Sequence, residues 1–243
     1  MLFKKVFKSF NFKKIVKQFS FFYFNMQQQF QLVLRTPYTM TIAGPTKCGK
    51  TSFVNNLIKN SDWLYESEPN KFYYFYNSIP PTEDHDAIHS MVTEFIEGVP
   101  SMEWMEEKYS QFGKNVTVII DDQDLNLNKD IAMLFNVGSS HFFANFIFIT
   151  HNIFGKQKEA REISLNSDYY VLCKQIRDKT QIRRFFSQHH PVNPKAAMAV
   201  YNDATRHPFS YLLLDFHQKT QDDFRMLDNI FFENNEHAHV YTI

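Results

Sequence analysis

One eight-residue stretch constrains this chain more than any other. Residues 44–51 read GPTKCGKT and fit the pattern G-x-x-x-x-G-K-[ST] at every fixed position. Glycines at 44 and 49 allow the backbone to turn successive N–H groups inward. Together with the start of a following helix, these groups form a cradle for phosphate oxygens. Because the chain has only 6 glycines, two in one loop are informative.

The charged and hydroxyl side chains of this stretch have distinct expected roles. Lys50 would place its positive charge against the β- and γ-phosphates, and the Thr51 hydroxyl is a hard oxygen ligand suited to Mg²⁺. Cys48 is open to two interpretations: a thiol whose pKa is lowered by the helix start and Lys50, or a small residue that fits the loop. The predicted phosphate-binding residues are Gly44, Pro45, Thr46, Lys47, Cys48, Gly49, Lys50, Thr51 and Ser52.

Strand and helix patterns alternate along the chain. A β-rich run at 38–43 precedes the loop, and apolar residues at helical spacing follow it in 51–59. This alternation predicts an α/β fold with a mainly parallel central sheet flanked by helices. The other expected strands are 71–76, 116–122, 145–150, 169–173 and 211–216, with an edge strand in 30–34. The other expected helices are 87–112 in two pieces broken at 98–100, 130–142, 178–189 and 194–205.

The charge of the chain is distributed unevenly, although its net charge is zero. Ten Lys and Arg residues precede the first acidic residue, Asp62, which leaves 16 basic against 26 acidic residues in the remainder. We divide the chain into a basic, Phe-rich extension (1–25), a main domain (26–233) and a polar tail (234–243). The extension suits contact with a membrane or nucleic acid, a targeting role, or an upstream segment if Met26 is the start.

Two features of the sequence bear on where in the cell the protein would be found. The two cysteines imply no disulfide framework, which fits a reducing intracellular compartment. No apolar run reaches the ~18 residues needed for a membrane span.

A pair of carboxylates follows the apolar strand 116–120. We assign Asp121 to the Mg²⁺ shell and Asp122 to orienting or deprotonating the attacking water. His151 and Asn152 follow the strand 145–150, where either side chain would reach both the γ-phosphate and the water; a capping turn is the alternative. Because ligands of parallel sheets sit beyond the carboxyl ends of the strands, these residues should converge with the loop on one edge.

Arginines are expected to stabilise charge on the transferring phosphoryl group, donated from a neighbouring copy. Arg161 and Arg177 are the candidates, and Arg183 and Arg184 would instead face solvent or DNA. Histidine pairs at 85/89, 189/190 and 237/239 have no evident third ligand, so we predict no metal site from them.

Several segments, spanning about residues 30–232, together resemble a known family. They are the strand–GPTKCGKT–helix unit, the aromatic second strand, VTVIIDD, FIFITHN, REISLNSDYYVLCK and the helix start RDKTQI. The combination is similar to the DNA-packaging ATPases of the FtsK–HerA superfamily of P-loop NTPases, of the kind encoded by Polinton (Maverick) elements and related double-jelly-roll DNA viruses.

The resemblance implies a RecA-like fold and a motor that hydrolyses ATP with Mg²⁺. It also implies a homo-oligomeric ring that moves double-stranded DNA into a viral capsid or portal-like vertex, in the host cytoplasm or nucleus or on the virion. Two residues depart from the family pattern. Superfamily members often carry Glu where this chain has Asp122, and commonly carry Gln where it has His151. We therefore expect turnover that depends on pH near neutrality.

Other functions remain open at this point. A small-molecule or nucleotide kinase would use the same phosphate loop, as would another DNA-dependent ATPase such as a helicase. A nucleotide-gated scaffold with little turnover is disfavoured by the intact set Lys50, Thr51, Asp121 and Asp122. The acidic pair and the lack of a Gly-rich lid favour hydrolysis over transfer.

Overall fold

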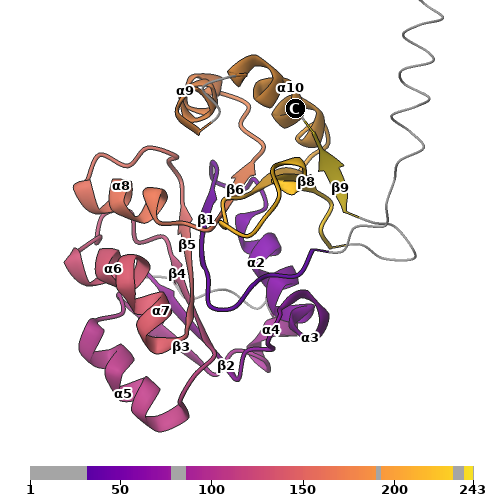
Figure 1. The fold of residues 1–243 in the computed structure, drawn as a ribbon. Coiled ribbons are helices and arrows are strands. Elements are labelled where there is room, and N and C mark those ends of the chain that lie inside the picture. The colour runs from indigo at the N-terminus through magenta and orange to yellow at the C-terminus, as the bar shows by residue number, and fades with distance from the viewer. Residues whose placement is uncertain (1–31, 78–85, 190–192, 232–237, 243) are drawn as a thin grey trace, which may run out of the picture. The chain divides into compact units, whose positions relative to one another are not determined.

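A nine-stranded sheet organises the described part of the chain in the computed structural model, which comprises residues 32–77, 86–189, 193–231 and 238–242 (Figure 1). The strand order is β3-β2-β4-β5-β1-β6-β7-β8-β9. The strands are β1 (Thr39–Ala43), β2 (Lys71–Tyr76), β3 (Glu94–Glu97), β4 (Val116–Asp121), β5 (Asn145–Thr150), β6 (Tyr169–Cys173), β7 (Tyr211–Asp215), β8 (Met226–Asp228) and β9 (His239–Tyr241). The first six of this order are parallel, and β7, β8 and β9 are antiparallel.

Helices cover both faces of this sheet (Figure 1). The helix after the phosphate loop, α2 (Lys50–Lys59), lies with α3 (Ser61–Leu64) and α4 (Asp86–His89) on one face. The other face carries α5 (Met102–Phe112), α6 (Lys129–Met133), α7 (Ser139–Phe142), α8 (Lys158–Leu165), α9 (Lys179–His189) and α10 (Pro194–Ala204). The predicted α/β class, with a mainly parallel sheet flanked by helices, is confirmed. One strand, β5, separates the loop strand β1 from the acidic strand β4, which is the RecA-like P-loop NTPase arrangement.

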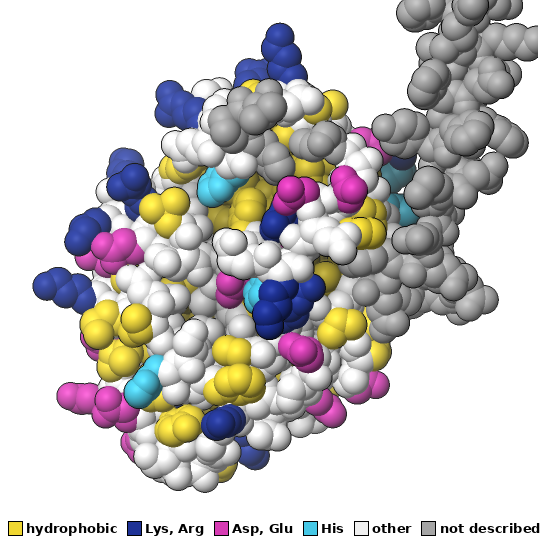
Figure 2. Space-filling view, viewed as in Figure 1, with side chains coloured by type: hydrophobic (Ala, Val, Ile, Leu, Met, Phe, Trp, Pro, Cys, Tyr) yellow, Lys and Arg dark blue, Asp and Glu magenta, His cyan; other side chains and the backbone are white. Residues whose placement is uncertain are grey.

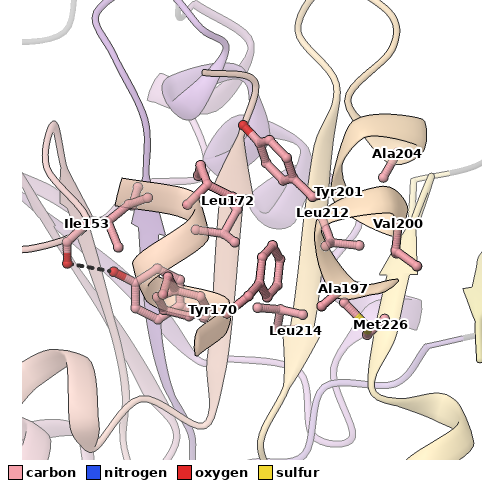
Figure 3. Packing of buried hydrophobic residues seen from close by; sticks show 14 residues of the cluster. Ile153, Tyr170, Leu172, Ala197, Val200, Tyr201, Ala204, Leu212, Leu214 and Met226 are labelled. Carbon is pink, nitrogen blue, oxygen red and sulfur yellow. Dashed lines mark hydrogen bonds between the residues drawn. The ribbon is translucent and has the colours of Figure 1, made fainter. Parts of the chain in front are cut away.

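The core on the six-helix face forms two apolar clusters. One lies beneath α9 and α10, where Leu214 of β7 and Ala197 of α10 face each other (Figure 3). In the same cluster the Tyr170 hydroxyl donates to the Ile153 carbonyl over 3.3 Å, which fixes the turn after β5 (Figure 3). The second cluster joins β2, β4 and β5 to the helices α5–α8. Strands buried on both faces must be nearly all apolar, which explains runs such as VTVII and FIFIT.

The structure corrects one helix prediction. Residues 87–112 were expected to be helical in two pieces, but only α4 and α5 are helical, and 94–97 form the edge strand β3 parallel to β2. The four residues of β3 are too few to show the alternation of apolar and polar side chains that marks a strand. In the sheet, the Phe95 ring lies 5.5 Å from the Tyr74 ring, a contact that an isolated helix could not provide. The break predicted at 98–100 is present, because Gly98 adopts a φ of 104°.

Other differences are smaller. The edge strand expected in 30–34 is reduced to one bridge between Leu34 and Tyr65. The predicted helix 130–142 is helical throughout but contains a π-helical turn at Leu134–Gly138. Helices 178–189 and 194–205 are confirmed, with side-chain caps from Asp178 and Asn193. The short strands β8 and β9 and the helix α8 were not predicted, and β9 lies within the segment expected to be a polar tail.

Candidate nucleotide site

The carboxyl edge of the parallel strands brings the predicted site residues together. Ala43, the last residue of β1, pairs with Thr150 at the end of β5 and with Leu172 near the end of β6, and Asp121 of β4 pairs with Ile149. Beyond this edge the Gly44 N–H donates to the Thr150 carbonyl over 3.2 Å. The phosphate loop is therefore joined directly to the strand end that carries His151.

Backbone conformation explains both glycines of the loop. Gly49 caps α2 with a φ of 103°, a left-handed value that side chains with a Cβ adopt at a cost. Gly44 is required for a different reason: a Cβ at this position would lie 2.6 Å from the Cys48 Sγ and 2.6 Å from the Cys173 Cβ. Lys47 also has a positive φ, of 63°. The loop thus combines two left-handed residues with a close approach at Gly44.

Lys50 is buried at the centre of the edge, with 7% of its surface exposed. Its Nζ donates to the Gly44 carbonyl over 2.8 Å and to the Pro45 carbonyl over 3.1 Å. The same Nζ lies 3.2 Å from the His151 Nδ1. An ammonium group has three N–H donors and no acceptor, so the imidazole Nδ1 is the acceptor in this contact. The lysine is thereby held against the first two residues of the loop and against His151.

His151 links Lys50 to the second carboxylate. Its Nε2 lies 3.1 Å from the Asp122 Oδ1, and because Nδ1 accepts from Lys50, Nε2 carries the proton that Asp122 accepts. Asp122 is exposed and adopts a φ of 53°, which turns it away from the end of β4. Strained backbone at a non-glycine residue of this kind clusters at functional sites. The predicted residues Lys50, Asp122 and His151 therefore form one connected chain.

Asp124 positions His151 in this series of contacts, and the sequence did not reveal this role. Its Oδ1 accepts from the Thr150 hydroxyl over 2.6 Å, and its Oδ2 accepts from the His151 N–H over 3.0 Å. The carboxylate thus holds the end of β5 and fixes the backbone from which the imidazole projects. A third acidic residue close behind the pair 121–122 was the available signal, but its spacing alone does not distinguish a clamp from a turn.

Asp121 is held by a tyrosine from the neighbouring strand, which the sequence also did not reveal. The Tyr74 hydroxyl of β2 donates to the Asp121 Oδ2 over 2.6 Å. Burial raises the pKa of Asp121, while the Tyr74 hydrogen bond and the charge of Lys50 act in the opposite direction. Burial likewise raises the pKa of Tyr74, and the Asp121 charge adds to that shift. In the aromatic run KFYYFY nothing marks one hydroxyl as different from the others.

The donor set at this edge fits a magnesium ion. Mg²⁺ prefers hard oxygen ligands and is commonly bound through one or two carboxylates together with phosphate oxygens. The Asp121 carboxylate offers such an oxygen in Oδ1, which accepts no hydrogen bond from the described residues. Thr51, in the first turn of α2, offers a hydroxyl. These two residues would hold the ion, in agreement with the ligand types predicted for it.

Three predicted residues are not joined to this chain of contacts. Asn152 is exposed, and its backbone N–H instead donates to the Thr150 hydroxyl over 3.1 Å, which closes a turn. Arg161 on α8 and Arg177 after β6 are exposed and form no hydrogen bond or ion pair with any described residue. A role in a neighbouring copy for either arginine stays a prediction, because a single chain is described.

Phe209 is a further residue at this edge. It precedes β7, is 70% exposed and has a φ of 60°, and its backbone lies against Gly49, where a Cβ would be 3.3 Å from the Phe209 Cβ. An exposed aromatic ring beside a phosphate loop offers a stacking surface for a base.

The histidines outside the site have other partners. The rings of His89 and Phe95 are 4.6 Å apart, and His239 forms an ion-pair contact with Asp228 at 2.7 Å. His85, His190 and His237 lie outside the described residues. Within the described ranges no group of three or more His, Cys, Asp or Glu residues is arranged to hold a metal ion.

Comparison with known proteins gives matches among solved structures alone. No protein-family profile and no curated protein matches the chain. One similar structure is the DNA-packaging ATPase B204 of Sulfolobus turreted icosahedral virus, with 12% identity and a TM-score of 0.49, covering 75% of this chain and 94% of that one. The genome packaging NTPase B204 of Sulfolobus turreted icosahedral virus 2, in complex with ATP-gammaS, has 14% identity and a TM-score of 0.48 over the same shares.

A third similar structure comprises ATPases 2 and 3 of EssC from Geobacillus thermodenitrificans. It has 12% identity and a TM-score of 0.42, and the match covers 62% of this chain and 34% of that one. At this identity the likeness lies in the course of the chain and not in its side chains. Within the described residues, no helix combines the length and apolar character needed to cross a bilayer.

Proposed function

We propose that this protein is a Mg²⁺-dependent ATPase whose active site is the carboxyl edge of β1, β4 and β5. The observation that carries the proposal is the contact chain from Lys50 through His151 to Asp122, at 3.2 Å and 3.1 Å. Lys50 belongs to the phosphate loop, and Asp122 is the candidate group for the attacking water. A single imidazole between them connects the residue that would contact the γ-phosphate to the residue that would orient the water.

Each residue has a chemical task in this scheme. Lys50 exchanges a loop carbonyl for phosphate oxygens and neutralises their charge, and the inward N–H groups of the loop hold the remaining oxygens. Thr51 and Asp121 would hold Mg²⁺, which when bound neutralises charge developing on the phosphoryl oxygens. Asp122 orients the attacking water and accepts its proton. His151 holds the Asp122 carboxylate toward the loop, and Tyr74 and Asp124 fix the carboxylate and the backbone behind it.

Phosphoryl transfer to a small acceptor is the competing function. A kinase would need an acceptor cavity at the loop. A cavity of about 1100 Å³ exists in the described structure, but it lies at the amino edge of β1 and β6, lined by Thr39, Asp168 and His217 among others. A substrate bound there would be at the far end of the strands from Lys50. This separation favours hydrolysis over transfer.

We extend the proposal to movement of double-stranded DNA, with genome packaging into a capsid as the biological role and a homo-oligomeric ring as the working form. The sequence resemblance of the segments from the phosphate loop to RDKTQI supports it. The exposed side of α9 supports it too, because Lys179 and Arg183 are four residues apart and therefore adjacent on the helix surface. Arg177, Arg184 and these two residues define the α9 basic strip.

DNA binding would need a local basic surface such as this strip. Residues 62–243 carry more acidic than basic side chains, so DNA cannot be attracted by the overall charge of that part. Figure 2 shows one face of the molecule, on which Lys and Arg side chains stand in separate groups interspersed with Asp and Glu. Contact with DNA would therefore be local, at the strip, and would become continuous where several copies place their strips around one pore.

The test is DNA affinity measured against nucleotide affinity. Replacing Arg183 and Arg184 together by Ala should weaken binding of double-stranded DNA and lower its salt dependence by about one to two phosphate contacts, while ATP affinity is kept. A matched control replaces Lys129 and Lys158 together, which are exposed on α6 and α8 and do not belong to the strip. Equal losses of DNA and ATP binding would indicate misfolding. Unchanged DNA affinity would show that the α9 basic strip does not bind DNA.

A further inference from the structure

The two cysteines of this chain meet at the phosphate loop. Cys48 is the fifth residue of the loop and Cys173 is the last residue of β6, and the sequence contains no others. Both are buried, with 8% and 3% of their surfaces exposed. The fold therefore places its entire thiol content beside the residues that would bind phosphate.

The contact between the two cysteines is close. The point where a Gly44 Cβ would lie is 2.6 Å from the Cys48 Sγ and 2.6 Å from the Cys173 Cβ. The Cys48 sulfur therefore lies no more than about 5.2 Å from the Cys173 Cβ. Only the absence of a side chain at Gly44 allows this approach. The glycine that opens the phosphate motif thus also makes room for a thiol pair.

Electrostatics gives the two sulfurs different chemical characters. The hydrogen bond from Cys173 and the positive charge of Lys50 outweigh burial and lower the pKa of Cys48 to about 7. The same hydrogen bond and burial raise the pKa of Cys173 well above its usual value. At neutral pH Cys48 is therefore about half thiolate, the nucleophilic form, and Cys173 is a protonated thiol beside it.

We propose that Cys48 and Cys173 form a reversible disulfide that closes the phosphate loop to ATP. With hydrogen peroxide as the oxidant, the Cys48 thiolate attacks one peroxide oxygen and releases hydroxide, which becomes water on protonation. The product is a sulfenic acid at Cys48. The Cys173 sulfur then attacks the Cys48 sulfur, and the sulfenic oxygen leaves as a second water. Two thiols are oxidised by two electrons, and one peroxide is reduced to two waters.

The disulfide and a bound triphosphate require different conformations of the phosphate loop. Sulfurs in a disulfide are about 2.05 Å apart, so the Cys48 sulfur must move toward β6, past Gly44. Lys47 and Gly49, on either side of Cys48, must follow, and these positions set the direction of the N–H groups that hold phosphate. Phosphate charge in the loop also disfavours the Cys48 thiolate. By linkage, ATP protects the thiols and the disulfide weakens ATP binding.

This inference rests on the proposed nucleotide site, and the experiment keeps the two separable. The full chain is treated with diamide, which accepts two electrons and two protons from a thiol pair and becomes a hydrazine. The reaction is followed by mass spectrometry of acid-quenched, alkylated protein under non-reducing conditions. We expect an internal Cys48–Cys173 crosslink that forms more slowly when ATP and Mg²⁺ are present. Its rate should rise with pH through about 7 and then level off, following the Cys48 thiolate.

ATP affinity is measured on the same samples. We expect the crosslinked chain to bind ATP at least about tenfold more weakly, which corresponds to about 1.4 kcal/mol, with full recovery after reduction by dithiothreitol. Cys173→Ser is the matched variant: it should bind ATP as the reduced parent does and keep that affinity in diamide. Failure of the crosslink to form, or a crosslinked chain with unchanged ATP affinity, overturns the inference. If the reduced parent does not bind ATP, the proposed function fails while the crosslink measurement still stands.

Discussion

The two edges of the parallel strands differ in how their polar groups are used. At the amino edge, polar side chains satisfy one another and the backbone: Asp168 accepts from the Thr39 N–H over 2.9 Å, and the Thr220 hydroxyl donates to Asp215 over 2.8 Å. At the carboxyl edge, the chain from Lys50 to Asp122 ends in an exposed carboxylate on strained backbone. Polar groups are thus mutually satisfied at the amino edge, whereas the proposed site at the carboxyl edge leaves a carboxylate open to solvent.

The comparison predicts opposite consequences for substitutions at the two edges. Groups at the amino edge lose partners when one of them is removed, so the folded state should suffer. Groups at the carboxyl edge are held in an arrangement that serves a reaction, so turnover should suffer while the folded state does not.

Lys50→Ala should reduce ATP turnover by about a thousandfold or more, because the variant lacks the charge that stabilises the transferring phosphoryl group. Its free energy of unfolding should stay within about 1 kcal/mol of the parent value. Phosphate release and chemical denaturation on the same preparations measure both quantities. If the variant lost turnover because it unfolds, Lys50 would contribute to stability in the same way as the residues of the amino edge.

Asp168→Ala should lower the free energy of unfolding by about 1–3 kcal/mol, because the buried Thr39 N–H loses its acceptor. Asp168→Asn is the control, since an amide oxygen can still accept from that N–H. ATP turnover per folded molecule should be the same in all three proteins. A fall in turnover without a fall in stability would mean that the amino edge takes part in the reaction.

Tyr74→Phe should lower turnover by about tenfold and raise the Mg²⁺ concentration needed for half-maximal activity, because groups behind a metal ligand orient it. The change removes one oxygen atom and keeps the ring in the core. Tyr73→Phe on the same strand is the matched control, since the Tyr73 hydroxyl has no hydrogen-bond partner among the described residues. If the two variants had the same magnesium dependence, the Tyr74 hydroxyl would not be the group that orients the magnesium ligand.

His151→Gln should keep most of the activity, because glutamine can hold one contact toward Lys50 or Asp122. Phosphate release measured beside the parent checks this. Turnover as low as that of Lys50→Ala would mean that glutamine cannot replace the imidazole between the two residues.

The sequence predicted which residues meet at this edge better than it predicted the residues that support them. The loop, the carboxylates and His151 follow apolar strands directly, and a parallel sheet must bring strand ends together, so their meeting was predictable. Tyr74 and Asp124 were not, because their roles depend on strand order: β2 lies beside β4, and the turn after β4 reaches the end of β5. The strand β3 was mistaken for helix for a similar reason, since its four residues are fixed by pairing with β2.

Steady-state ATP hydrolysis with and without long double-stranded DNA tests the central claim most directly, with Lys50→Ala as the blank. The account predicts Mg²⁺-dependent phosphate release that DNA stimulates and that the blank lacks. Turnover that ignores DNA, or that appears only when a small phosphoryl acceptor is added, would contradict it and favour the kinase function.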